Sequence, residues 1–179
     1  MKKSFIIYCL GMFLVLSGFA QDKPMRVGLK FGVPNIAGLN LEYATGKFAP
    51  TLDFSYFSLG DESTGKVSFS YIEIGSNYYF KEEGKGLYGH LSYGRVGLTA
   101  TYDDAFGKGE GTAAINLVNI KIGAKLGNGF YFRPEIGFAA GGGGTYEVTY
   151  DDADATVVEY AAPGVFGGVV FNLGFGVAF

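Results

Sequence analysis

Apolar and polar residues alternate with a period of two along most of the chain after residue 21. The clearest case is the last segment, where every second residue from Val169 to Phe179 is apolar and the residues between them are mainly glycine, alanine and Asn172. A strand with this pattern has one apolar face and one polar or empty face. The stretches that share the pattern lie at 25–33, 39–43, 52–56, 72–80, 87–98, 119–126, 130–138 and 169–179. The alternation therefore predicts an all-β protein with eight strands.

Two of these stretches contain an irregularity. In the fifth, the apolar positions change parity between Tyr93 and Val96. A β-bulge near Gly94 and Arg95 would account for the change. In the seventh, Pro134 removes a donor from the ladder, so we expect a second bulge there, near the end of the sheet that carries the short turns.

The connections between the stretches alternate in length. The short ones are 44–47, 81–86 and 127–129, and the longer ones are 58–66, 101–112 and 141–156. The longer segments carry the acidic clusters of the chain, and we expect 145–150 and 157–160 to form a hairpin that projects beyond the rest. Short turns at one end and long loops at the other are typical of an antiparallel up-and-down meander that closes into a barrel.

Alternation alone leaves open which face of such a barrel points outward. A lipocalin-like soluble barrel would turn Phe and Leu inward and expose the charges. However, the interior of an eight-stranded barrel is only just wide enough for side chains, and rows of Phe, Tyr and Leu would overfill it. The glycines also lie mainly on the polar face. The pattern therefore favours an eight-stranded antiparallel transmembrane β-barrel with its apolar face in lipid, where only closure pairs every backbone group.

In that arrangement the interior holds charges of both signs. The residues expected in this interior charge network are Arg26, Lys30, Glu42, Asp53, Glu73, Lys121, Lys125, Arg133 and Glu135. A buried charge without a partner is costly, so we expect them to pair. The pattern favours a structural plug, since eight strands leave no aqueous channel. A path for protons or ions is the alternative.

The first residues have the character of a secretory signal. A basic head is followed by the apolar run 5–16 and by small residues up to Ala20, which predicts a signal peptide at 1–20 and a barrel domain at 21–179. The apolar run is too short for the alternative, an N-terminal transmembrane anchor. Cys9, the only cysteine, would leave with the signal.

The composition changes this picture little. The chain is 48% hydrophobic and 17% charged, with 30 glycines, 13 tyrosines and 17 phenylalanines, so disorder is excluded. The net charge of −3 offers no basic surface for nucleic acid. Tryptophan is absent, so aromatic girdles at the membrane interfaces would consist of Tyr and Phe.

Candidates for catalysis are few. His90, the only histidine, and Ser92 lie on the same polar face, which would suit a lipid-acting hydrolase or acyltransferase. The sequence around the serine has no nucleophile elbow. One histidine and no cysteine after residue 20 cannot form a zinc site, so we expect neither a metal nor a cofactor.

The C-terminal segment FNLGFGVAF resembles the insertion signal of outer-membrane β-barrel proteins, in which a terminal aromatic residue ends an alternating strand. The residues that carry this resemblance are Phe171, Leu173, Phe175, Val177 and Phe179. With the signal sequence and the strand pattern, the chain is similar to the family of small bacterial outer-membrane barrels of the porin-like or OmpA/OmpX type. The resemblance implies a bacterial outer membrane, contact with its lipid, and assembly by the barrel-assembly machinery.

Three functions are compatible with these observations. The first is a non-enzymatic structural or surface-interaction protein whose acidic loops contact an extracellular ligand. The second is a porin-like conduit for small solutes or apolar compounds. The third is a lipid-acting enzyme built on His90 and Ser92.

Overall fold

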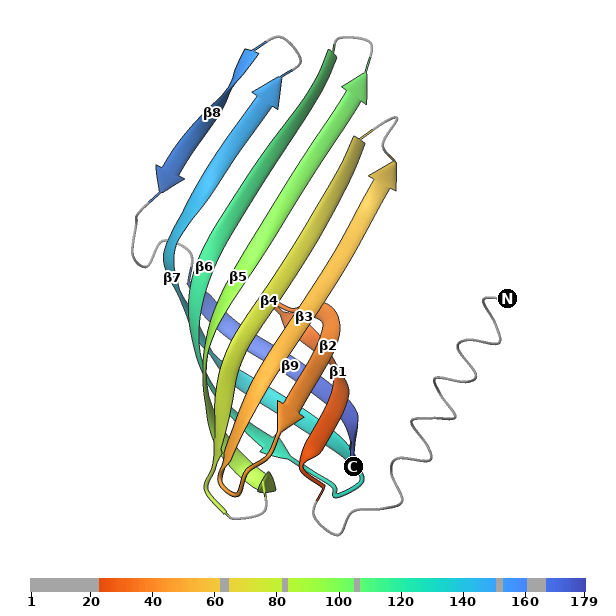
Figure 1. The fold of residues 1–179 in the computed structure, drawn as a ribbon, viewed down its shortest axis with the longest axis vertical. Coiled ribbons are helices and arrows are strands. Elements are labelled where there is room, and N and C mark those ends of the chain that lie inside the picture. Colours follow the sequence, from red (N-terminus) through yellow and green to blue (C-terminus); the bar gives the residue numbers. More distant parts are fainter. Residues whose placement is uncertain (1–22, 62–64, 82–83, 105–106, 151–152, 161–166) are drawn as a thin grey trace, which may run out of the picture.

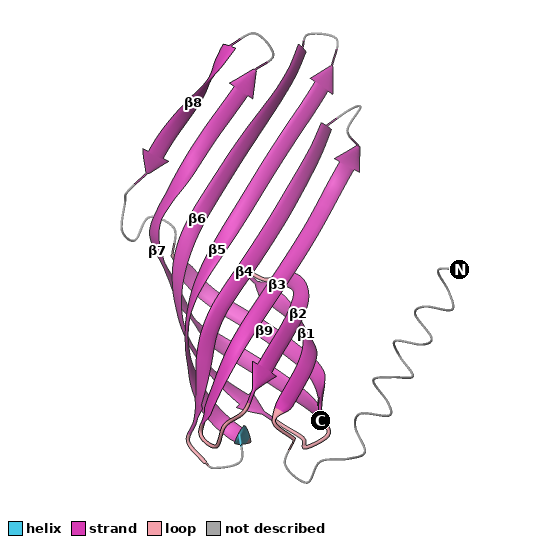
Figure 2. Ribbon diagram, viewed as in Figure 1, coloured by secondary structure: helices cyan, strands magenta, loops and turns pink. Residues whose placement is uncertain are grey.

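The computed structural model describes residues 23–61, 65–81, 84–104, 107–150, 153–160 and 167–179, and the predicted signal peptide at 1–20 lies outside them. Nearly all of the described chain is β-strand (Figure 2). The strands are β1 (Met25–Val33), β2 (Ile36–Tyr43), β3 (Phe48–Asp61), β4 (Gly65–Tyr79), β5 (Gly86–Asp104), β6 (Gly107–Lys125), β7 (Phe130–Tyr150), β8 (Ala153–Tyr160) and β9 (Gly168–Ala178). Within the described residues, no helix has the length and apolar character to cross a membrane.

Eight of these strands form a closed antiparallel barrel (Figure 1). The eight are β1 to β7 and β9. Each strand from β1 to β6 pairs with the next, and β9 closes the barrel by pairing with β7 on one side and β1 on the other. At the seam, the amide of Met25 donates to the carbonyl of Phe179 at 3.1 Å, and the amide of Phe179 donates back at 2.9 Å. The predicted eight-stranded barrel is therefore confirmed.

The strands β3 to β7 continue beyond the closed barrel, whereas β1, β2 and β9 do not (Figure 1). With β8, which pairs with the upper half of β7, they form a six-stranded open sheet. We call it the extension sheet, and it consists of residues 57–61, 65–70, 95–104, 107–117, 140–150 and 153–160. The predicted hairpin is part of it, because Thr145 lies opposite Glu159 and Glu147 opposite Val157.

The three long loops expected from the sequence are therefore mostly strand. The structure continues β3 to Asp61, β5 to Asp104 and β7 to Tyr150, and the following strands begin three or four residues later. The prediction was wrong because these segments are rich in Gly, Ser, Thr and Asp, which are frequent in turns. Cross-strand pairing over the whole length of the hairpins outweighs this local preference.

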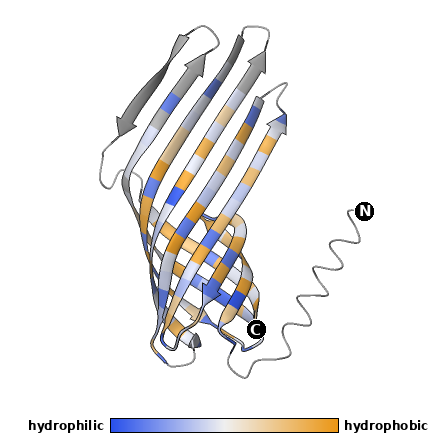
Figure 3. Cartoon of the chain, in the orientation of Figure 1, coloured by the Kyte–Doolittle hydropathy of each residue, from blue (hydrophilic) through white to orange (hydrophobic). Residues whose placement is uncertain are grey.

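Large apolar side chains point outward around the closed barrel. On β3 they run from Phe48 to Tyr56, on β6 from Val118 to Leu126, and on β7 from Phe130 to Phe138. Most of these side chains are exposed, with exposed fractions between 38% and 69%. Eight steps of about 3.3 Å at a tilt of about 40° rise about 20 Å, and side chains at both ends extend this toward the roughly 25 Å apolar band of membrane barrels. Figure 3 shows the apolar residues along the wall of the barrel. The lipocalin-like alternative is therefore excluded.

Aromatic residues lie at both edges of this apolar belt, and they are Tyr and Phe, as the absence of tryptophan requires. Phe48 and Tyr78 are paired neighbours at the lower edge, with ring centroids 5.2 Å apart. Tyr56 and Tyr93 are exposed at the upper edge. Such rings suit the boundary between hydrocarbon and headgroups.

The bulge expected near Gly94 and Arg95 is absent. From Tyr88 to Thr101, β5 keeps one register with β4, and it keeps one register with β6 over its whole length. The parity change has another cause: Tyr93 points outward into the belt, whereas Val96 points inward and is 9% exposed. The strand is regular, and the apolar residues move to its other face where it leaves the belt.

The bulge expected at Pro134 is also absent. The pairing of β7 with β9 continues through Pro134 and Leu173. On the other side, the ladder with β6 stops at the pair of Gly123 with Glu135 and resumes with the same offset at the bridge of Leu126 with Phe132. Proline has no amide hydrogen, so the ladder is interrupted there without a change of register. The register of β7 with β6 shifts instead within the glycine run 141–144.

Candidate functional site

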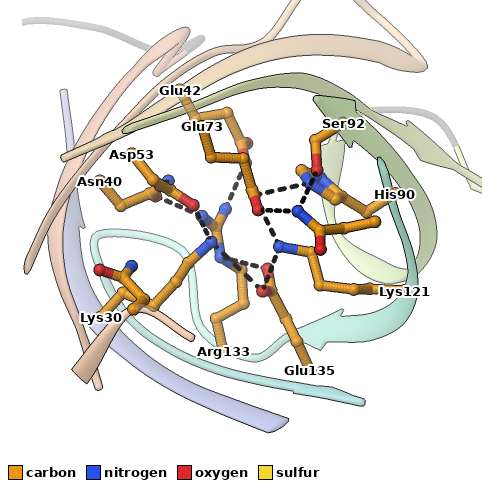
Figure 4. Close-up of polar contacts among 12 residues, drawn as sticks. Lys30, Asn40, Glu42, Asp53, Glu73, His90, Ser92, Lys121, Arg133 and Glu135 are labelled. Carbon is orange, nitrogen blue, oxygen red and sulfur yellow. Dashed lines mark hydrogen bonds and ion pairs between the residues drawn. The ribbon is translucent and has the colours of Figure 1, made fainter. Parts of the chain in front are cut away.

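The interior of the barrel is built from the inward positions of its strands, and charged side chains occupy many of them. Each of the following is at most 3% exposed: Arg26, Lys30, Glu42, Asp53, Glu73, Lys121, Arg133 and Glu135. We call these eight residues the charge network, and it contains four basic and four acidic groups. Figure 4 labels seven of them, all except Arg26, and shows that these seven side chains extend from different walls of the barrel and meet near its centre.

Glu42 is the centre of the lower part of the network. Its carboxylate forms ion pairs with the guanidinium groups of Arg26 and Arg133. It also accepts hydrogen bonds from the hydroxyl of Tyr79 at 2.9 Å and from the amide of Asn77 at 2.6 Å. Two basic groups and two neutral donors therefore share one buried carboxylate, which satisfies its lone pairs.

Glu73 has the same role in the upper part. Lys121 donates to Oε1 at 2.6 Å, and Nε2 of His90 lies 3.0 Å from the same oxygen. The other oxygen accepts hydrogen bonds from the Tyr71 hydroxyl and from the Asn119 amide, the latter at 2.7 Å. Glu73 thus joins side chains from three strands, β4, β5 and β6.

Glu135 and Lys30 connect these two parts. The Glu135 carboxylate lies 3.2 Å from the Lys30 amine, 3.6 Å from the Lys121 amine and 3.5 Å from Nε of Arg133. Lys30 in turn pairs with Asp53. Since Arg133 also contacts Glu42, the eight charges form one continuous network across the barrel.

Lys125, which the sequence placed in the same network, lies apart from these eight. Its amine is 3.5 Å from the carbonyl oxygen of Gly127, in the turn after β6, and 5.4 Å from the centre of the Tyr131 ring. It therefore lies at the short-turn end of the interior, below the network.

Two interior tyrosines, Tyr71 and Tyr88, are the part of the site that the sequence analysis missed. Tyr71 and Tyr88 are at most 1% exposed and donate to Glu73 and Glu135, respectively. A signal was available, because each stands two positions before an interior residue, Glu73 or His90, and so shares its face. The alternation does place Tyr79 and Tyr131 on the polar face, but it assigned neither Tyr71 nor Tyr88 to the interior.

Inward glycines make room for these rings. Gly123 lies directly opposite Tyr88, and the three atoms nearest to a Cβ added to it would all belong to the phenol group of Tyr88. Gly176 likewise lies opposite Tyr131. The guanidinium of Arg133 lies 5.8 Å from the ring centres of both Tyr88 and Tyr131, within the range of cation–π attraction.

His90 and Ser92 are both buried but do not form a catalytic pair. Both ring nitrogens of His90 are occupied, Nδ1 by Asn77 at 2.6 Å and Nε2 by Glu73. Ser92 accepts a hydrogen bond from Asn119 at 3.3 Å. Nucleophilic catalysis needs the hydroxyl within hydrogen-bond reach of the base, and the described contacts direct these two residues to other partners. In the part of the chain that the structure describes, no cluster of His, Cys, Asp and Glu could hold a metal ion.

Four of the five C-terminal residues with the predicted assembly role lie in β9, between β7 and β1, and Phe179 follows directly after the last residue of this strand. Phe171 and Phe175 point outward and are 48% and 41% exposed. Their role as an insertion signal stays a prediction.

No protein-family model matches this chain, and no curated protein matches it. Among solved structures, it is similar to Acinetobacter baumannii CarO, with 13% identity, 90% of this chain and 100% of that chain covered, and a TM-score of 0.44. It is also similar to Acinetobacter baumannii CarO2, with 10% identity, coverages of 89% and 100%, and a TM-score of 0.44. A third similar structure is the N-terminal β-barrel domain of Pseudomonas aeruginosa OprF, with 15% identity, 87% of this chain and 95% of that chain covered, and a TM-score of 0.43. The function is therefore inferred from the residues of this chain itself.

Proposed function

We propose that this chain is a non-enzymatic barrel of the bacterial outer membrane that is closed to ions and solutes and that holds the extension sheet at the cell surface. The observation that carries the proposal is the charge network, in which four basic and four acidic side chains, all buried, contact one another across the barrel.

The outer surface supports the membrane location. The belt of exposed apolar side chains surrounds the closed barrel, and the strands leave no unpaired edge within it. Closed barrels with such a belt span bacterial outer membranes, with their longer hairpins outside the cell and their short turns in the periplasm. The extension sheet then faces the exterior.

The interior supports closure. An ion that crossed the barrel would have to separate pairs such as Glu73 with Lys121 or Glu42 with Arg133. Removing one partner from a buried ion pair costs about 3–5 kcal/mol, and several pairs lie across the path. A plug that ties the strands together fits this arrangement better than a proton or ion path does.

The extension sheet supports a role in surface interaction. Above Ser55, β3 pairs with β4 alone in the described chain, and β8 pairs with β7 alone, so the sheet has two edges. An unpaired edge offers backbone donors and acceptors to an extended segment of another protein. We propose that these edges are where an extracellular partner binds.

Electrical recording tests the closed interior. Purified barrel is inserted into planar lipid bilayers, and the current is measured under an applied potential. We expect no stable conductance steps from the protein. Steady ohmic steps that scale with the number of inserted barrels would contradict the proposal.

Cysteine labelling tests the orientation, since the chain has no cysteine after Cys9. Ser68→Cys places a thiol in the extension sheet, and Thr45→Cys places one in the turn between β2 and β3. A membrane-impermeant maleimide added to intact cells should label the first variant and not the second, whereas lysed cells should label both. Labelling of Thr45→Cys alone on intact cells would reverse the proposed orientation.

A further inference from the structure

The extension sheet has an apolar inner face. Phe69 on β4 packs against Val96 and Leu117, which are buried in the upper interior of the barrel. Phe57 lies directly opposite Phe69 on one side, and Leu98 lies opposite it on the other. Directly opposed residues share a face, so Phe57 and Leu98 point toward the same side as Phe69.

This face continues upward and stays open. Leu59 lies opposite Val67, two positions beyond the pair of Phe57 with Phe69, and therefore on the same face. The exposures are 42% for Phe57, 61% for Leu59, 53% for Val67 and 41% for Leu98. Four large apolar side chains thus form one patch that the described chain leaves uncovered, where a monomeric protein ordinarily exposes such residues singly.

The outer face of the same strands is polar. Ser58 and Ser68 lie opposite each other there, with their hydroxyl oxygens 3.1 Å apart. Thr99 lies opposite Ser68 on the next strand. The two faces therefore have the opposite polarity to those of the belt, where apolar side chains point outward and polar ones inward.

Below the patch, buried apolar side chains fill the upper end of the barrel interior. Tyr71, Val96 and Leu117 pack together, are each at most 9% exposed and lie just above Glu73 and Asn119, to which the Tyr71 hydroxyl is bonded. A molecule on the inner face therefore meets an apolar layer first and the charge network beneath it, so it would be held at the outer mouth.

The barrel wall across from the extension sheet is shorter than the sheet itself. The wall made of β1, β2 and β9 ends near the turn at 34–35 and at Gly168, while β3 to β8 rise beyond it (Figure 1). The outward residues along this low wall, Val33 and Val169, are 61% and 60% exposed and belong to the apolar belt. Above this wall, the inner face of the extension sheet has no strand opposite it in the described chain.

The charge of the extension sheet indicates what kind of molecule fits. The sequence of these strands contains seven acidic and three basic residues, a net negative charge that disfavours anions such as fatty-acid carboxylates. We infer that the inner face of the extension sheet binds neutral apolar small molecules, such as alkanes, against the patch of Phe57, Leu59, Val67 and Leu98. This inference rests on the proposed position of the sheet outside the bilayer, which the labelling of Ser68→Cys tests separately.

Tryptophan fluorescence gives a direct test, because the chain has no tryptophan of its own. Val67→Trp places a single reporter on the inner face, and Thr99→Trp places one on the outer face of the neighbouring strand. Each barrel is reconstituted in dimyristoylphosphatidylcholine vesicles and titrated with 1-bromododecane, whose bromine quenches nearby indole. We expect saturable quenching of the reporter at 67 and only weak, linear quenching of the reporter at 99. Leu98→Trp is a second inner reporter in case the first variant fails to fold.

Two further arms identify the occupant. The anionic 12-bromododecanoate should quench the inner reporter with about tenfold weaker affinity, because the net negative charge of the extension sheet repels its carboxylate. Vesicles of dibromo-phosphatidylcholine should quench a belt reporter, Leu91→Trp, and leave the inner reporter bright. Equal quenching of the reporters at 67 and 99 by bromododecane would overturn the proposal, as would strong quenching of the inner reporter by the brominated phospholipid, which would mean that membrane lipid covers the face.

A matched pair of substitutions ties binding to the patch. Ala113 lies opposite Leu98 on the inner face, and Ala114 is the next residue, on the outer face. With the reporter at 67, Ala113→Asp should weaken the binding of bromododecane and Ala114→Asp should leave it unchanged. Equal effects of the two substitutions would contradict a site on the inner face.

Discussion

Replacement of Glu42 by glutamine should destabilise the barrel more than any change at its surface. The substitution keeps the shape of the side chain but removes the charge that Arg26 and Arg133 share. It also replaces one carboxylate oxygen, a hydrogen-bond acceptor, by an amide NH2 group, which is a donor. Tyr79 and Asn77 both donate to this carboxylate, so the new donor faces other donors. Removing one partner of a buried pair costs about 3–5 kcal/mol, so we expect the free energy of unfolding to fall by about 4 kcal/mol.

The assay is equilibrium unfolding by urea of the barrel folded in phospholipid vesicles, followed by circular dichroism. Glu110→Gln, an exposed carboxylate on β6, is the matched control and should change the free energy of unfolding by less than about 0.5 kcal/mol. In the Glu42→Gln background, Arg26→Met should cost about 1–3 kcal/mol less than it does in the wild-type chain, because the two residues are coupled. If Glu42→Gln unfolds within about 1 kcal/mol of the wild type, the network does not hold the barrel together.

Three further predictions concern closure, packing and assembly. Glu73→Gln and Arg133→Met should each destabilise the barrel by about 3 kcal/mol without opening a conductance, and a large stable current from either variant in planar bilayers would refute the plug. Gly123→Ala should destabilise it by about 1–3 kcal/mol, because the added methyl group meets the Tyr88 ring. Gly123→Ala combined with Tyr88→Leu should recover part of this loss in the same urea assay, and an unrelieved double variant would mean that the ring is not the obstacle. Phe179→Ala should lower the amount of folded barrel in cells, measured as the heat-modifiable band on gels, while refolding of the purified variant into detergent stays unchanged; equal yields in cells would show that the terminal ring is not read during assembly.

The fold could be predicted because a membrane barrel constrains its sequence at every second position. The outward residues of strands such as 130–138 must be apolar, and their inward neighbours, such as Arg133 and Glu135, need not be. The charged members of the interior followed from the same parity, since a charge cannot face hydrocarbon without a large cost. Which charges would contact each other did not follow, because that depends on the stagger between strands, which alternation leaves undetermined.

Tyrosine was harder to place than the charges because it suits both environments. Tyr78 points outward at the edge of the belt, and its neighbour Tyr79 is buried and donates to Glu42. The ring is apolar enough for the lipid boundary, and the hydroxyl is polar enough for the interior. Besides the parity of the strand, the inward glycines mark the buried rings, since Gly123 opposite Tyr88 leaves space that no other residue would leave.

The position where the sequence pattern broke is the position where the solvent changes. Below Tyr93 the outward side chains of β5 face hydrocarbon, and above Arg95 they are small or polar, as at Thr99, while the inward ones become Val96 and Leu98. A bulge would have explained the parity change by local geometry, but the continuous register shows that the geometry does not change. The apolar residues change face because lipid no longer covers the outside, and an apolar inner face is retained although water reaches it. Since exposing such a face to water lowers stability, its presence is better explained by an apolar occupant than by folding.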